Sequence, residues 1–129
     1  MHWNSNSIKS KYEEFVYFLE VHKLDIVSLN ETKLCENDNF NIRNYQIIRF
    51  DRNSRGGGVA ILISDKISYE QIGIFDKFNL ELVAIKIRFK NSFINLISWY
   101  LAPQAPFPDK LFFQKLYKTK NLIIMGDFN

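Results

Sequence analysis

Apolar residues recur at helical spacing near the start of the chain. Tyr12, Phe15, Val16 and Leu19 follow the i, i+3, i+4, i+7 pattern of one helix face. The residues between them are mostly charged, which is typical of a half-buried helix. Ser10 precedes a glutamate at the spacing of a capping box, so the pattern predicts a helix that begins near Ser10.

Short apolar or alternating segments predict roughly seven strands. They are residues 1–4, 25–31, 45–50, 58–64, 80–89, 93–101 and 121–129. Residues 32–44 are polar and predict a loop, whereas Lys90-Asn91 has the length of a two-residue hairpin turn. Segments 58–64 and 121–129 do not alternate, so we expect both strands to be buried.

A second helix is expected after Pro106 and Pro108, with Leu111, Phe112 and Leu116 marking its turns. The helices therefore stand early and late, with a meander of strands between them. Neither a regular β-α alternation nor a sandwich of strands alone fits this order. The order favours an α/β layered fold with mixed sheets, and no linker or repeat divides residues 1–129.

Composition narrows the class of protein. The 129 residues are 47% hydrophobic, which suits one globular domain or a piece of one. The formal charge of +3 permits an anionic partner without requiring one. A single cysteine, Cys35, excludes an internal disulfide and favours a reducing, intracellular compartment. No apolar run approaches the roughly 18 residues of a membrane span, so no membrane partner is expected.

Two acids, Glu31 and Asp127, directly follow predicted strands. Ligands bind at the carboxyl ends of strands in layered α/β folds, and two carboxylates with neighbouring amides suit Mg²⁺ and a phosphate. Acids also end strands simply because strands end at the surface, and for Glu31 alone this is the more common explanation. Asp127 is the stronger candidate, because Gly126 allows the backbone to turn sharply beside it.

Three further polar residues stand at predicted strand ends. They are Asn4, Tyr100 and Asn129. Asn4 alone is explained equally well as a loop cap, and Tyr100 alone as an aromatic residue packed at a strand edge. The phenol of Tyr100 could instead approach a phosphate oxygen.

An arginine-rich connection contains Arg49, Arg52 and Arg55 beside three glycines. Arginines on a loop suit contacts to nucleic-acid phosphates, and a solvated loop explains them about as well. The glycines precede a strand and lack a Lys-Ser/Thr partner, so they are not a nucleotide-binding loop. Neither His2 nor His22 has the spacing of a metal ligand.

The order of these residues resembles the endonuclease/exonuclease/phosphatase superfamily over the whole chain. Within it, the chain most resembles the apurinic-type endonuclease domain of non-LTR (LINE-like) retrotransposons. The segments that carry the resemblance are WNSNSI (3–8), DIVSLNETKL (25–34), RFDR (49–52), GGGVAILI (56–63), SWYLAP (98–103) and IIMGDFN (123–129).

The resemblance implies a four-layer α/β sandwich of the DNase I-like kind and phosphoester hydrolysis with Mg²⁺ or Mn²⁺. It makes Glu31 the metal ligand and Asn4 an organiser of the metal and phosphate site. It places Tyr100 against the scissile phosphate, Asp127 at the attacking water and Asn129 on the phosphate. DNA is the implied partner, with a reverse transcriptase downstream and access to the nucleus in an intact element.

The family's later motifs, including a terminal Ser-Asp-His segment, are absent from residues 1–129. We therefore expect an incomplete domain, its N-terminal portion only, that is inactive by itself. Two alternatives remain: another phosphoesterase of the superfamily, or a non-catalytic retrotransposon remnant that binds nucleic acid or does nothing.

Overall fold

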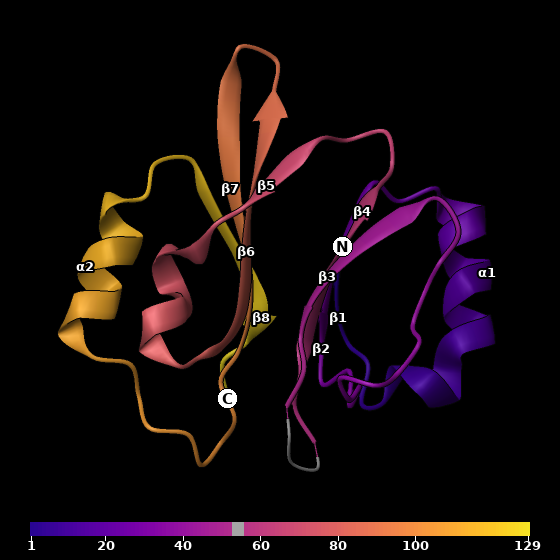
Figure 1. Cartoon of the computed structure of the whole chain (residues 1–129), viewed down its shortest axis with the longest axis horizontal. Coiled ribbons are helices and arrows are strands. Elements are labelled where there is room, and N and C mark those ends of the chain that lie inside the picture. Colours follow the sequence, from indigo (N-terminus) through magenta and orange to yellow (C-terminus); the bar gives the residue numbers. More distant parts are fainter. Residues whose placement is uncertain (53–55) are drawn as a thin grey trace.

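The computed structural model describes residues 1–52 and 56–129, and they form four layers (Figure 1). Helix α1 (Tyr12–His22) covers the outer face of one sheet. Helix α2 (Lys110–Lys118) and the 3₁₀ helix η2 (Gly73–Phe78) cover the outer face of the other. The expected four-layer α/β sandwich is therefore confirmed.

The first sheet has the strand order β1-β2-β4-β3. Its strands are β1 (His2–Asn4), β2 (Ile26–Asn30), β3 (Tyr45–Phe50) and β4 (Val59–Ser64). Strand β1 runs parallel to β2, and the other pairs are antiparallel. Phe15 and Leu19 of α1 are buried against this sheet, as the helical spacing predicts.

The second sheet has the order β5-β6-β7-β8. Its strands are β5 (Tyr69–Gln71), β6 (Glu81–Phe89), β7 (Ser92–Tyr100) and β8 (Leu122–Asp127). Phe89 pairs with Ser92, so the predicted two-residue hairpin turn between β6 and β7 is confirmed. Strand β8 runs parallel to β7. Phe112 and Leu116 of α2 are buried on the outer face of this sheet.

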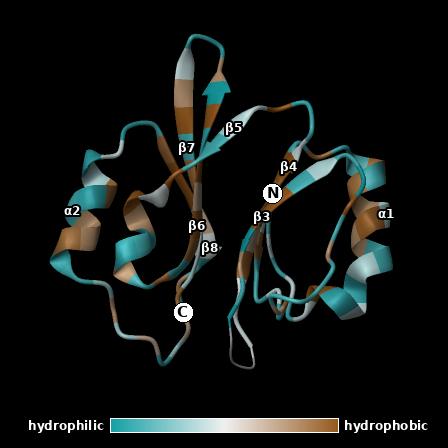
Figure 2. Ribbon diagram, in the orientation of Figure 1, coloured by the Kyte–Doolittle hydropathy of each residue, from teal (hydrophilic) through white to brown (hydrophobic). Residues whose placement is uncertain are grey.

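Hydrophobic side chains occupy the interior of this arrangement. In Figure 2 brown segments are most frequent on the strands, whereas the helices alternate between brown and teal along their turns. Residues Val59–Ile63 of β4 are completely buried between α1 and the second sheet, as their lack of alternation predicts. No helix in the described part of the chain is long and apolar enough to span a membrane.

Three details differ from the sequence predictions. The capping box does not form, because a 3₁₀ turn, η1 (Ile8–Lys11), leads directly into α1 and the Ser10 hydroxyl donates to the carbonyl of Ser7. Strand β8 is not buried: it is an edge strand in which Ile123 and Ile124 are 46% and 37% exposed. The short strand β5 brings the described strands to eight, one more than expected.

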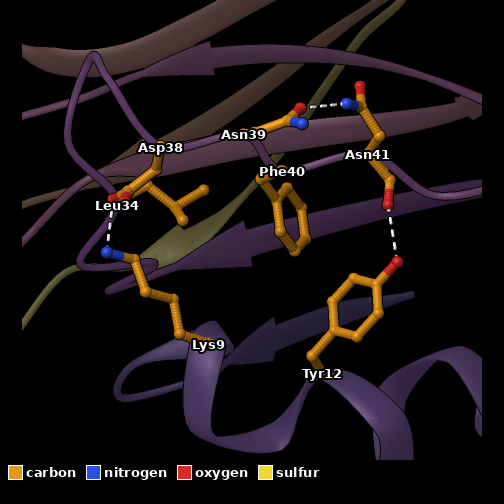
Figure 3. A pocket seen from close by; sticks show the side chains of 7 residues that line it. All are labelled: Lys9, Tyr12, Leu34, Asp38, Asn39, Phe40 and Asn41. Atoms are coloured by element: carbon orange, nitrogen blue, oxygen red, sulfur yellow. Dashed lines mark hydrogen bonds and ion pairs between the residues drawn. The ribbon is translucent and has the colours of Figure 1, made fainter.

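The predicted loop between β2 and β3 has no regular structure but is firmly held. Figure 3 shows Lys9 reaching the carboxylate of Asp38, at 2.5 Å, and the Tyr12 hydroxyl donating to the Asn41 carbonyl. The hydrogen bond from Lys9, with one from the Cys35 N–H, lowers the pKa of the Asp38 carboxyl. These contacts attach the loop to α1 and η1, on the far side of the first sheet from the second.

Candidate active site

The two parallel strand pairs end at the same edge of the sandwich. Asn4 is in register with Asn30, one residue before Glu31, and Tyr100 is in register with Asp127. Strands β1 and β2 contact β8 across the interface between the sheets. The carboxyl ends of all four strands therefore converge, which is where α/β folds place their ligands.

The side-chain amide of Asn4 joins the two candidate acids. Its Nδ2 donates to Glu31 Oε1 and to Asp127 Oδ2, both at 2.9 Å. Its Oδ1 accepts the backbone N–H of Asn6 at 3.2 Å, which fixes the direction of the amide. One asparagine thus holds a carboxylate from each sheet.

Tyr100 and Asn129 lie beside this group. Burial raises the pKa of the Tyr100 phenol, and the charge of Glu31 and a hydrogen bond to it raise that pKa further. The phenol therefore stays protonated and able to donate a hydrogen bond at neutral pH. The backbone N–H of Asn129 donates to Asp127 Oδ1 at 3.3 Å, while its side-chain Nδ2 donates to the Leu101 carbonyl at 3.1 Å. The structure thus brings together all five strand-end residues predicted from the sequence.

The backbone at Glu31 is unusual and is supported by the glycine-rich connection. Glu31 has a φ of 50°, in the left-handed region that non-glycine residues seldom adopt and that is enriched at functional sites. The N–H groups of the next two residues, Thr32 and Lys33, donate to the carbonyls of Gly58 and Gly57. A Cβ on Gly58 would lie 2.5 Å from Thr32 Oγ1, so this close approach requires glycine. The glycines therefore support the segment that presents Glu31.

A buried polar cluster connects the sheets directly beneath the site. Ser28 Oγ and Ser98 Oγ are 2.8 Å apart, and Asn30 Nδ2 donates to the Trp99 carbonyl at 2.8 Å. All three side chains in this cluster, Ser28, Asn30 and Ser98, are fully buried. Buried polar groups are costly unless paired, so these bonds fix how β2 lies against β7.

The arginines predicted to contact nucleic acid lie in different surroundings. Arg49 donates to the carbonyl of Asp38 at 2.9 Å and pairs with Asp51 at 3.1 Å, so its guanidinium is held within the fold. Arg52 pairs with Glu81 at 3.2 Å and lines a groove that also contains Glu31 and Tyr100. Arg55 lies outside the described residues. Contact with nucleic acid stays a prediction for all three.

Glu81 is a site residue that the sequence analysis missed. Its Oε1 pairs with Arg52, and its Oε2 accepts the Gly58 N–H at 2.8 Å. It therefore ties the second sheet to the glycine-rich connection of the first, at the groove beside Tyr100. Glu81 opens an alternating strand and carries no local signal of this role, which depends on how the two sheets pack.

The donor set fits a hard divalent cation. Among residues 1–52 and 56–129, no three or more His, Cys, Asp or Glu side chains form a metal-binding group. Mg²⁺, however, keeps several waters and commonly takes one or two carboxylates from the protein. Glu31 and Asp127 supply two carboxylates, and each has one oxygen bound to the amide of Asn4. Glu31 is the candidate for holding Mg²⁺ or Mn²⁺, with the carboxylate of Asp127 beside it.

The fold and this convergence of polar strand ends define a phosphoesterase architecture, and comparison with known families agrees. The model of the endonuclease/exonuclease/phosphatase family matches residues 1–129. The chain belongs to this family. A comparison with curated protein sequences gave no match.

The solved structures with this fold include an endonuclease domain of a non-LTR retrotransposon, the group that the sequence most resembles. The endonuclease domain of TRAS1, a telomere-specific non-LTR retrotransposon, is 18% identical with a TM-score of 0.70, over 98% of this chain and 56% of that one. The Xenopus laevis APE2 catalytic domain is 19% identical (TM-score 0.63; 99% and 57% covered). The 3' phosphatase NExo from Neisseria, bound to a product DNA hairpin, is 18% identical (TM-score 0.61; 99% and 56% covered). The chain thus spans little more than half the length of these proteins, and the likeness establishes the fold.

Proposed function

We propose that this chain carries the N-terminal part of a divalent-metal-dependent DNA endonuclease that nicks target DNA for retrotransposon integration. The observation that carries the proposal is the Asn4 amide, which holds Glu31 and Asp127 from opposite sheets at 2.9 Å each. The likeness to the TRAS1 endonuclease domain supports the retrotransposon branch.

Each residue has a role that its position supports. Glu31 holds the metal, and Asn4 positions Glu31 and Asp127. Asp127 accepts the proton of the attacking water: the Asn4 amide holds its Oδ2, and its Oδ1 accepts a longer bond, at 3.3 Å, from the Asn129 N–H. Tyr100, whose phenol is protonated at neutral pH, donates to a phosphate oxygen, and Asn129 contacts the phosphate. When bound, the metal neutralises the phosphate and stabilises the negative charge that develops on it.

Activity requires more than these residues. The chain spans 56% of the TRAS1 domain. We therefore propose that a Ser-Asp-His segment completes the site in a longer chain, with a reverse transcriptase beyond it and access to the nucleus. In that case, the 129-residue chain alone does not cleave DNA.

Another phosphoesterase of the same family is the second candidate. It is favoured by the NExo structure, a 3' phosphatase that matches 99% of this chain with a TM-score of 0.61. A substrate panel distinguishes the two candidates: supercoiled plasmid, an abasic duplex and an oligonucleotide with a 3' phosphate. Removal of the 3' phosphate without plasmid nicking would favour this candidate over the endonuclease.

A domain continued through the Ser-Asp-His segment is expected to nick supercoiled plasmid in Mg²⁺. Glu31→Gln removes a charge that the metal needs, so we expect nicking to fall by about 10²–10³-fold. Gel separation of supercoiled and open-circular plasmid measures the rate. Glu36→Gln, on the exposed loop after β2, is the matched control and should leave the rate unchanged.

Two results would contradict this proposal. One is equal nicking by the Glu31→Gln and unaltered domains. The other is clean nicking by the 129-residue chain that Glu31→Ala abolishes, which would show that the chain needs no further residues.

A further inference from the structure

Helix α2 presents an exposed aromatic face that the candidate active site does not use. Tyr117 is 93% exposed, and Phe107, just before the helix, is 74% exposed. Phe107 stacks on Phe113, with ring centroids 5.4 Å apart and an interplanar angle of 24°. Tyr117 follows Phe113 by four residues and therefore lies on the same side of the helix. The three rings form a row along one surface, which we call the α2 face.

The segment that contains the α2 face is also basic. Residues 103–126 contain four lysines and one aspartate, a net +3 that equals the formal charge of the whole chain. Lys110 lies about two helical turns before Tyr117 on the same side of α2, Lys118 directly follows Tyr117, and both lysines are exposed. The aspartate, Asp109, is engaged as the N-cap of α2, where it accepts the Phe112 N–H at 2.9 Å.

Helix α1, on the opposite outer layer, provides a contrast. Its Tyr17 is 69% exposed, in a setting much like that of Tyr117. The residues three or four positions away from Tyr17 include Glu13, Glu14 and Glu20, so its surroundings are acidic. Of the two helices on the outer layers, α2 therefore combines exposed rings with positive charge, whereas α1 combines them with negative charge.

We propose that the α2 face binds single-stranded DNA, by stacking unpaired bases on Phe107, Phe113 and Tyr117 and by pairing phosphates with Lys110 and Lys118. Exposed rings beside a basic surface are the usual platform for single strands. In a duplex the bases already stack on one another, so these rings would add little. The preference for DNA over RNA rests on the proposed function, whereas the preference for a single strand rests on the rings alone.

The position of the α2 face relative to the site suits this role. The connection from the end of β7 to the start of α2 passes along the edge where the chain ends, and then reaches the outer layer (Figure 1). Its first residues, Ala102 to Pro106, line the groove that contains Glu31 and Tyr100. Phe107 follows directly, so a strand that leaves the groove along this connection meets the α2 face.

Fluorescence polarisation with a labelled oligothymidylate of about 12 nucleotides tests the proposal, using the 129-residue chain with EDTA present. We expect Tyr117→Ala to weaken binding about tenfold, since each stacked base contributes about that much. Tyr17→Ala, the matched control on α1, should leave the affinity unchanged. Lys118→Gln should reduce the slope of log affinity against log salt by about 0.7. Both tyrosines are well exposed, and circular dichroism checks that each variant folds.

Three results would overturn the proposal. The first is equal affinity for oligothymidylate in the unaltered chain and in Tyr117→Ala. The second is tighter binding of duplex DNA or of oligouridylate than of oligothymidylate. The third is self-association of the chain that Tyr117→Ala abolishes. The last would make the α2 face an interface between copies. Because EDTA removes divalent ions, the binding test does not involve the proposed metal site, and its failure would not count against the proposed nuclease. Likewise, the nicking test of Glu31→Gln does not test DNA binding by the α2 face.

Discussion

Gly126→Ala is expected to lower the free energy of unfolding by about 3–5 kcal/mol, which is as large a loss as severe core defects cause. A Cβ at position 126 would lie 2.0 Å from the Trp99 carbonyl oxygen and 3.0 Å from the Phe128 ring. Trp99 is the register partner of Gly126, so the backbone at either residue cannot move away without breaking the parallel pairing of β7 with β8. Urea unfolding followed by circular dichroism measures the loss.

Gly73→Ala is the matched control for this substitution. A Cβ there would meet only the carboxylate of Asp76, at 3.0 Å, and this exposed side chain can move away. We expect a change of no more than about 0.5–1 kcal/mol. Equal losses for Gly126→Ala and Gly73→Ala would contradict the explanation. Because Asp127 follows Gly126 directly, the first variant should also displace Asp127 from Asn4.

Asn30→Asp should be almost as damaging, with an expected loss of about 3–5 kcal/mol at neutral pH. Asn30 is fully buried and donates to the Trp99 carbonyl at 2.8 Å. The introduced carboxylate has no N–H to donate and would place a negative charge against a carbonyl oxygen, close to Glu31. Burial raises the pKa of the introduced carboxyl, and a protonated carboxyl can donate, so the loss should shrink as the pH falls towards about 4, the ordinary aspartate value.

Asn95→Asp gives the comparison for Asn30→Asp. The Asn95 amide also donates to a backbone carbonyl, that of Lys120 at 2.7 Å, but Asn95 is only half-buried and this bond is open to solvent. Solvent can hydrate an introduced charge there, so we expect a loss of about 1 kcal/mol or less. Urea unfolding at pH 7 and at pH 3 measures both variants. A pH-independent loss for Asn30→Asp would contradict the burial argument.

Local pattern was enough to predict most of the fold. The helical spacing of Phe15 and Leu19 identifies the buried face of α1, and the apolar runs locate seven of the eight described strands to within a few residues. The strand-end positions of Glu31 and Asp127 follow from the same runs. Strand direction then brings them together, because parallel pairs end at a common edge.

What local pattern could not predict depends on packing between distant segments. The bond from Asn30 to Trp99 joins residues 69 positions apart and depends on how the two sheets lie on each other. The same holds for Glu81, whose partners Arg52 and Gly58 belong to the other half of the sandwich. The apolar run of β8 predicts burial, but its edge position leaves Ile123 exposed.

We propose above that Glu31, positioned by Asn4, holds a divalent cation at the edge where the sheets meet. Titration of the 129-residue chain with Mn²⁺, followed by electron paramagnetic resonance of the free ion, tests it directly. We expect one bound Mn²⁺ whose affinity falls by at least about tenfold in Glu31→Gln and in Asn4→Ala, while Glu36→Gln binds Mn²⁺ as the unaltered chain does. Equal Mn²⁺ affinity for Glu31→Gln and the unaltered chain would contradict it.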